Sequence, residues 1–235
     1  MENLKQHIQL DKSIPVLKAK NVDGNRFYEK EDGTRYPSIT TVLGILKKEG
    51  LERWRKAVGE EVANYISIKA ANRGTAVHHM VEDYLNNMAE TEFIEKHNKK
   101  FLPRMMFDLL KQQVLQRINS IHLQEQQMYS DKWTIAGRVD CIAEYDGELS
   151  VIDFKTSTKE KKEDWIENYF IQGSAYAEMY EEHFGTPINQ VVILIVTEDG
   201  TVQTFRKDKK DYLPKLKDAI QKFYKWIETK NETNT

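Results

Sequence analysis

An Asp146-Gly147 dipeptide separates two runs of mixed apolar and charged residues, at positions 137–145 and 148–155. Both central residues of a type I′ turn need a positive φ, which Asp and Gly tolerate, so this arrangement predicts a tight β-hairpin. A two-residue loop pairs Tyr145 with Glu148, and the rest of the register follows by counting back along both strands. The sequence therefore predicts which side chains face each other across the hairpin.

The predicted register brings two aspartates together. It places Asp140 opposite Asp153 and Arg138 opposite Lys155, so that one face carries four charges. Directly opposed side chains have Cβ atoms about 5 Å apart, and like charges at this spacing are destabilising. A hard divalent cation such as Mg²⁺ would remove the repulsion, because it takes carboxylate oxygens as ligands. With Lys155 on the same face as Asp153, the pattern indicates a metal-dependent phosphodiesterase.

The alternative interpretation is a solvated charge network. The flanking Arg and Lys could neutralise the aspartates at the surface, where ion pairs stabilise a protein little. The same register, however, pairs Val139 with Phe154 and Cys141 with Ile152, which indicates strands close to the core. An unpaired carboxylate is costly there, and this favours the metal site.

The length and composition favour one soluble domain. The chain has 235 residues, of which 40 % are apolar. We expect a hairpin and helical region over residues 1–120, a catalytic α/β core over residues 121–230 and a frayed tail over residues 231–235. The net charge of −2 argues against a passive nucleic-acid binder that relies on phosphate neutralisation alone. The single cysteine excludes internal disulfides, and we expect no iron–sulfur cluster.

The apolar runs are too short to span a bilayer, so no membrane association is expected. The first seven residues have neither an apolar signal core nor an Arg-rich transit character. We therefore expect a protein that is not secreted, in the cytoplasm of a bacterium or of a phage-infected host cell.

The periodicity along the chain predicts a mixed sheet flanked by helices, which is an α/β fold with a helical N-terminal region. A short hairpin is expected around a turn at residues 31–33, and Ser38 is a candidate helix N-cap. The expected helices cover residues 51–87, 99–119, 163–183 and 209–230, and the expected strands cover residues 121–129, 134–145, 149–155, 190–196 and 201–205.

Two helices carry further candidate site residues. On the first, His78 falls about 80° from the centre of the apolar stripe, whereas His79 falls about 180° away and is expected to face solvent. A histidine at this boundary is more often structural than a ligand, but His78 can reach a cleft beside the sheet. Glu82 lies one turn further on the same edge, where its carboxylate could orient the imidazole or contact a metal-bound water.

The helix after the hairpin places Gln172 and Tyr176 one turn apart at the edge of its apolar stripe. Both can hydrogen-bond to a phosphate, although boundary Gln and Tyr residues commonly serve only in packing. Gly173 lies at the centre of the stripe and predicts a close approach to the sheet. Glu125, in the strand before the hairpin, is a candidate third carboxylate.

Taken in order, these motifs resemble the RecB-like branch of the PD-(D/E)XK nuclease superfamily. The likeness rests on four segments. They are Gly74-x-x-x-His78-x-x-x-Glu82, Gly137-Arg138-Val139-Asp140, Asp153-Phe154-Lys155-Thr156-Ser157 and Gln172-x-x-x-Tyr176. Within that branch the chain resembles the group of the mitochondrial genome maintenance exonucleases and their phage relatives. It departs from the motif that names the superfamily in having Val139 instead of proline before Asp140.

The resemblance implies a restriction-endonuclease-like core and a metal-dependent DNA exonuclease. It implies that Mg²⁺ or Mn²⁺ is held by His78, Asp140, Asp153 and the backbone carbonyl of Phe154. Lys155 would act with Asp140 and Asp153 in catalysis, and its side chain could assist deprotonation as a neutral amine if burial lowered its pKa. The residues that would contact substrate or support the metal ligands are Glu82, Glu125, Arg138, Gln172 and Tyr176.

The implied substrate is DNA, single-stranded or with free ends. Because the chain has no Walker A motif, any motor would be a separate helicase or another replication or recombination protein. Two alternatives stay open at this point. One is an endonuclease of the same superfamily that cuts branched or flapped DNA, and the other is a non-catalytic DNA-binding module that has kept the fold.

Overall fold

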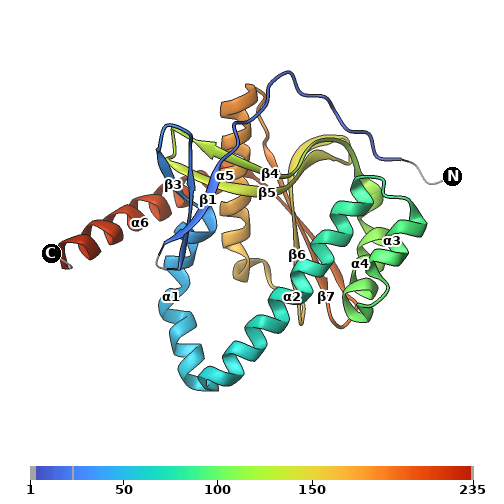
Figure 1. The fold of residues 1–235 in the computed structure, drawn as a ribbon, viewed down its shortest axis with the longest axis horizontal. Coiled ribbons are helices and arrows are strands. Elements are labelled where there is room, and N and C mark those ends of the chain that lie inside the picture. Colours follow the sequence, from blue (N-terminus) through green and yellow to red (C-terminus); the bar gives the residue numbers. More distant parts are fainter. Residues whose placement is uncertain (1–3, 23, 234–235) are drawn as a thin grey trace.

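The computed structural model describes residues 4–22 and 24–233 (Figure 1). Its elements, with three short 3₁₀ segments between them, are β1 (Lys18–Val22), β2 (Asn25–Glu29), β3 (Arg35–Pro37), α1 (Ile39–Val58), α2 (Glu60–Leu85), α3 (Glu90–His97), α4 (Phe101–Gln113), β4 (Ile118–Ser130), β5 (Ile135–Tyr145), β6 (Glu148–Ser157), α5 (Glu167–Phe184), β7 (Gln190–Thr197), β8 (Val202–Asp208) and α6 (Leu213–Thr233). None of the described helices is long and apolar enough to cross a membrane.

A five-stranded mixed sheet forms the centre, in the order β4-β5-β6-β7-β8. Strands β6 and β7 are parallel and are joined by α5, whereas the other neighbouring pairs are antiparallel. Strands β1 to β3 form a separate small sheet. The expected mixed sheet flanked by helices is therefore confirmed.

The Asp146-Gly147 turn is present as predicted, with φ of 53° at Asp146 and 81° at Gly147. Tyr145 pairs with Glu148, and the ladder continues to Cys141 opposite Ile152. It ends there, so the expected pairs further along, with Asp140 opposite Asp153, Val139 opposite Phe154 and Arg138 opposite Lys155, do not form. From this point β5 and β6 separate.

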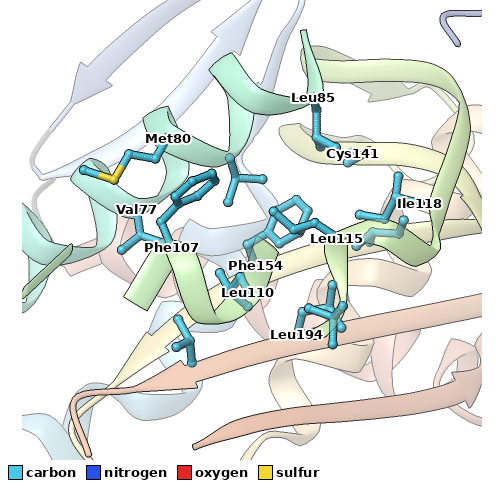
Figure 2. Packing of buried hydrophobic residues seen from close by; sticks show 14 of the residues in the cluster. Val77, Met80, Leu85, Phe107, Leu110, Leu115, Ile118, Cys141, Phe154 and Leu194 are labelled. Atoms are coloured by element: carbon cyan, nitrogen blue, oxygen red, sulfur yellow. The ribbon is translucent and has the colours of Figure 1, made fainter. Parts of the chain in front are cut away.

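One face of the sheet is covered by α2 and α4. Figure 2 shows Phe107 and Leu110 of α4 packed against Phe154 of β6 and Leu194 of β7. These side chains are at most 3 % exposed. Burying a Phe or Leu side chain stabilises a fold by about 1.5–3 kcal/mol. Val77 and Met80 of α2 belong to the same cluster, so the helix that carries His78 is also packed on the sheet.

The opposite face is covered by α1, α5 and α6, whose buried side chains share a second cluster with β5 and β6. Gly173 of α5 lies so close to β7 that a Cβ there would be 2.3 Å from Cγ1 of Val191. The close approach predicted for this glycine is thus confirmed.

The side chains of β5 do not alternate regularly between the two faces of the sheet near Asp140. Val139 packs in the second cluster, whereas Cys141, two residues later, packs in the first.

The prediction of one continuous helix over residues 51–87 is wrong. The segment is divided at Gly59, whose φ of 88° and ψ of 145° cannot continue a helix. The predicted cap is present, because Ser38 accepts a hydrogen bond from the backbone N–H of Thr41 at the start of the 20-residue helix α1. Figure 1 shows α1 and α2 meeting in a V at the bottom of the view.

Other boundaries also differ from the expectations. Strand β1 and helix α3 were not expected, and residues 118–119 begin β4 instead of ending a helix. Helix α6 continues to Thr233, so residues 231–233 do not belong to the expected frayed tail, and residues 234–235 lie outside the described residues.

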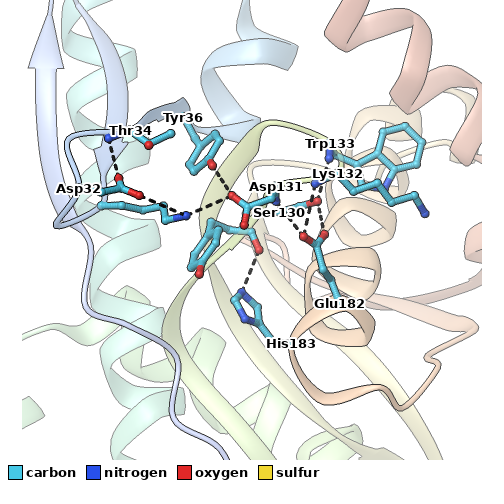
Figure 3. Close-up of polar contacts among 11 residues, drawn as sticks. Asp32, Thr34, Tyr36, Ser130, Asp131, Lys132, Trp133, Glu182 and His183 are labelled. Atoms are coloured by element: carbon cyan, nitrogen blue, oxygen red, sulfur yellow. Dashed lines mark hydrogen bonds and ion pairs between the residues drawn. The ribbon is translucent and has the colours of Figure 1, made fainter.

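The small sheet is tied to the main one by a polar network (Figure 3). The Tyr36 hydroxyl of β3 donates to Asp131, and the Tyr36 ring stacks on Tyr129 with centroids 5.9 Å apart. Glu182 of α5 accepts hydrogen bonds from the Ser130 hydroxyl at 2.5 Å and from the Asp131 backbone N–H at 2.9 Å. These contacts fix the loop between β4 and β5, and with it the alignment of those strands.

Candidate active site

Three candidate ligands meet where β5 and β6 separate. His78 projects from α2, and its Nδ1 lies 3.7 Å from Oδ2 of Asp140 and 3.8 Å from Oε1 of Glu125. Potential ligand atoms of the three side chains all lie within 4.8 Å of one another. His78 was predicted at the edge of the buried face and is 26 % exposed, whereas His79 is exposed as expected.

Glu125 lies across from Asp140 in the sheet, because its neighbours Gln124 and Gln126 pair with Cys141 and Val139. Its φ of 48° is unusual for a strand residue and marks a local irregularity in β4. The sequence singled out Glu125 only as a possible third carboxylate. The structure places it in the same cluster as His78 and Asp140.

Asp140 and Phe154 make the contact that replaces the strand ladder. The Phe154 backbone N–H donates to Oδ2 of Asp140 at 2.9 Å. The carbonyl oxygen of the same residue lies 2.7 Å from Nε2 of His78. Both backbone groups of Phe154 are therefore engaged by side chains of the site.

Asp153 is the most deeply buried carboxylate of the site, with its side chain 2 % exposed. Lys155, two residues later on β6, places its Nζ 2.5 Å from this carboxylate. Parallel pairing with β7 fixes both residues, with Asp153 opposite Ile193 and Lys155 opposite Ile195. The charged pair thus lies on the part of β6 that pairs with β7 but no longer with β5.

The charges shift the pKa values of these groups. Burial by itself would lower the pKa of His78, but the Asp140 charge and the contact with Glu125 outweigh it and raise the pKa to about 9. Burial is the main reason that the pKa of Asp153 rises to about 6, and the nearby Asp140 charge adds to the rise. A protonated imidazole therefore balances the carboxylates in the free protein.

From the sequence, Lys155 could assist deprotonation only if burial lowered its pKa, and this condition is not met. Burial does act in that direction, but the charges of Asp153 and Asp140 outweigh it, so the pKa is raised. Lys155 is therefore an ammonium ion, which can donate hydrogen bonds but cannot accept a proton.

The donor set fits a divalent cation. His78, Glu125 and Asp140 offer ligand atoms that all lie within 4.8 Å of one another, whereas both oxygens of Asp153 are close to the Lys155 ammonium, which donates to Oδ1 and lies 2.5 Å from Oδ2. Carboxylates that gather this closely repel each other, and a bound divalent cation offsets their charge. Carboxylate and carbonyl oxygens are the ligands that Mg²⁺ and Mn²⁺ prefer, and one imidazole is compatible with Mn²⁺.

Gln172 and Tyr176 lie together on α5. Nε2 of Gln172 donates to the Tyr176 hydroxyl at 3.3 Å, and Tyr176 is buried. The phenol ring lies against Gly137, where a Cβ would be 2.7 Å from Cε1 of Tyr176. Gly137 is therefore required for the packing of Tyr176 beside β5, which explains a glycine three residues before Asp140.

Arg138 and Glu82 border the site without joining the cluster. Nε of Arg138 lies 3.0 Å from Oε2 of Glu125, and the Arg138 side chain is 57 % exposed. Glu82 lines a cavity of about 270 Å³ together with His78, Glu125 and Arg138. The contacts that orient the His78 imidazole come from Phe154, Asp140 and Glu125, and not from Glu82 as the sequence suggested.

Comparison with known proteins gives one family. The sequence model of the PD-(D/E)XK nuclease superfamily matches residues 49–233. The mitochondrial genome maintenance exonuclease 1 of Homo sapiens is 26 % identical over 178 residues, which make up 70 % of this chain and 50 % of that protein. The Mus musculus protein of the same name is 29 % identical over 179 residues, which make up 70 % of this chain and 51 % of that protein.

The chain thus spans about half the length of the curated relatives it matches. Among solved structures, a putative exonuclease from Eubacterium rectale superposes with a TM-score of 0.47 at 11 % identity. The superposition covers 65 % of this chain and 66 % of that chain.

Proposed function

Because the chain belongs to the PD-(D/E)XK nuclease superfamily, we propose that it is a metal-dependent deoxyribonuclease that removes nucleotides from the ends of DNA, preferring single-stranded ends. The observation that carries this proposal is the meeting of His78, Glu125 and Asp140 beside Asp153 and Lys155 at the point where β5 and β6 separate. The names of the matched relatives support the exonuclease mode.

We assign metal binding to His78, Asp140, Asp153 and the carbonyl oxygen of Phe154, and we add Glu125 because it belongs to the same cluster. A bound Mg²⁺ or Mn²⁺ would lower the pKa of a coordinated water and offset negative charge at the phosphate. The His78 imidazole must lose its extra proton to serve as a ligand, so the metal displaces a proton from the site.

Lys155 has a different role in this proposal. Its ammonium group is fixed by the Asp153 carboxylate and lies beside the metal ligands. From there it can donate hydrogen bonds to the attacking water and to a non-bridging oxygen of the scissile phosphate. In this way Lys155 orients the nucleophile and stabilises the charge that develops during hydrolysis.

The remaining polar residues that the sequence singled out have different roles in this proposal. Arg138 extends into solvent beside the cavity and can reach a phosphate. The Gln172 and Tyr176 pair lies on the other side of β5, where the buried Tyr176 aligns α5 with the strand that carries Asp140. Glu82 lines the cavity and could contact a metal-bound water.

An assay on end-labelled DNA tests the function. Purified protein is incubated with linear and circular single-stranded DNA and with duplex DNA, in Mg²⁺, Mn²⁺ or EDTA. We expect metal-dependent shortening of linear strands from an end, intact circles, and no cleavage by the Lys155→Ala variant. Cleavage of circles would indicate an endonuclease instead. Binding without cleavage under every metal would indicate the non-catalytic module. The separate helicase or replication partner and the cytoplasmic location stay predictions.

A further inference from the structure

Lys47 of α1 lies beside the candidate active site although it is distant from it in sequence. Leu43, one turn earlier on α1, is buried in the cluster that includes Ile171 and Ala175 of α5. Residues four apart lie on the same side of a helix, so Lys47 extends this side towards the beginning of α5. There its Nζ lies 5.6 Å from the ring centroid of Tyr169.

The Tyr169 ring contacts a second ammonium group. Nζ of Lys155 lies 5.1 Å from the same ring centroid. Ammonium groups within about 6 Å of an aromatic centroid are attracted by the ring, which fixes their positions. Tyr169 therefore holds Lys47 close to the lysine that we assign to the scissile phosphate.

A third lysine adds to the positive charge. Burial and the charges of Lys155 and Lys161 lower the pKa of Lys47. The backbone of Lys161 is fixed by Gln203, whose side chain accepts from its N–H at 2.8 Å and donates to its carbonyl oxygen at 3.1 Å. Lys155 is paired with Asp153, but among the side chains that the structure describes neither Lys47 nor Lys161 forms an ion pair with a carboxylate. The charges of Lys47 and Lys161 therefore repel that of Lys155, and a bound polyanion would relieve the repulsion.

We infer that Lys47 binds a backbone phosphate of single-stranded DNA next to the phosphate held at Lys155, and that Tyr169 positions Lys47 for this contact. The inference rests on the proposed function, since it takes Lys155 as the residue at the scissile phosphate. Trp165, four residues before Tyr169 in the sequence, is 62 % exposed and its ring centroid lies 5.4 Å from Nζ of Lys162. Basic side chains interleaved with aromatic rings are typical of surfaces that bind unpaired strands.

The chain offers a matched control in Lys48. This lysine is the next residue of α1, but it lies with Thr41 and Gly44 on the side of the helix that lines a different cavity. Its Nζ is 5.7 Å from the Trp226 ring centroid, so it also has an aromatic partner. Substituting Met at position 47 or 48 removes one positive charge from the same helix and keeps most of the aliphatic stem.

Binding is measured by fluorescence anisotropy with a labelled oligothymidylate of about 12 nucleotides in EDTA, which prevents hydrolysis. We expect Lys47→Met to weaken binding by about tenfold, and to reduce the slope of log K against log[NaCl] by about 0.7, the value for one phosphate contact on a single strand. Lys48→Met is expected to leave both quantities unchanged. Circular dichroism checks that both variants are folded.

A double-mutant cycle tests the part played by Tyr169. We expect Tyr169→Leu to weaken binding in the wild-type background and to do so much less in the Lys47→Met background, since the two residues act together. Additive losses would overturn the positioning role of Tyr169. Equal losses from Lys47→Met and Lys48→Met, or no loss from either, would overturn the phosphate site.

The two proposals fail in different experiments. Metal-dependent cleavage by the wild-type protein, with identical binding by Lys47→Met and Lys48→Met, would refute the Lys47 site and keep the nuclease. Binding that depends on Lys47, without cleavage under any metal, would refute the nuclease activity and keep a single-strand phosphate contact. Absence of any binding by the wild-type protein would overturn the Lys47 site.

Discussion

The backbone N–H of Phe154 donates to Oδ2 of Asp140 at 2.9 Å, where Asp140 is one residue beyond the last paired residue of β5 and Phe154 is two residues beyond the last paired residue of β6. A carboxylate thus takes the place of the backbone carbonyl that would continue the ladder. The same oxygen lies 3.7 Å from Nδ1 of His78. Asp140 therefore serves the fold and the candidate metal site at once.

Two substitutions of Asp140 separate these roles. Asp140→Asn keeps an acceptor for the Phe154 N–H, so we expect stability within about 1 kcal/mol of wild type and cleavage reduced at least about 100-fold. Asp140→Ala leaves the buried N–H without a partner and should cost about 1–3 kcal/mol more. Urea unfolding and the end-labelled DNA assay measure the two quantities. Equal stability of the two variants, or full activity of Asp140→Asn, would contradict this division.

Metal binding should depend on His78 and not on His79. We expect Mn²⁺ to raise the melting temperature of the wild-type protein, because a ligand that binds only the folded state stabilises it. His78→Ala should weaken Mn²⁺ affinity by at least about tenfold, since it removes a proposed ligand. The adjacent exposed His79, changed to Ala, should keep the wild-type response. Titration calorimetry with Mn²⁺ decides this, and equal affinities for both variants would remove His78 from the metal site.

Two glycines should respond to alanine with opposite signs. A Cβ at Gly173 would be 2.3 Å from Cγ1 of Val191, so Gly173→Ala should destabilise the protein by about 1–3 kcal/mol. At Gly44 of α1, no described atom outside the adjoining residues and the backbone of the same helix lies within 4 Å of the added carbon, and Gly44→Ala should stabilise by about 0.5–1 kcal/mol. Chemical denaturation of both variants measures the effect, and Val191→Ala combined with Gly173→Ala should recover part of the loss.

Stability should fall at acidic pH partly through Glu178. Burial tends to raise its pKa, but hydrogen bonds from Lys209, Lys132 and Trp133 outweigh burial and lower it to about 2. A carboxyl whose folded pKa lies below its unfolded value near 4.5 stabilises above that value, and the stabilisation is lost as pH falls from about 4.5 to about 2. Glu178→Gln should therefore lower the unfolding free energy at pH 7 by about 2 kcal/mol.

The pH profile of that variant provides the check. Between about pH 5 and pH 3, the unfolding free energy of Glu178→Gln should decline less steeply than that of the wild type, because one titrating group is gone. Parallel profiles for the two proteins would show that Glu178 has an ordinary pKa.

Several features of the fold could be predicted from local sequence signals. The Asp146-Gly147 turn determines its own register, because a two-residue loop leaves no freedom in the pairing of Tyr145 with Glu148. Gly173 was identifiable from its place in the middle of an apolar stripe, and Ser38 from its place before a helix. Each of these features depends on residues that are neighbours in the sequence.

The separation of β5 and β6 could not be predicted by counting, because it depends on a side chain taking the place of a backbone group. The position of Glu125 was also inaccessible, since the loop over residues 131–134 gives no fixed count between β4 and β5. Similarly, Lys47 reaches Tyr169 only through the packing of α1 on α5. Sequence patterns identified these side chains or their helices, and tertiary packing decided which of them meet.

Beyond Ile152, the backbone of β6 is held by β7 and not by β5 within the described residues. The orientation of Asp153 and Lys155 therefore depends on their backbone pairing with residues 193–195 of β7, whose side chains are all aliphatic and fully buried. Volume changes at these apolar positions would shift the charged groups without touching DNA or metal. We therefore expect substitutions in this strand to alter the rate of the proposed nuclease, although the strand contributes no chemical group to the site.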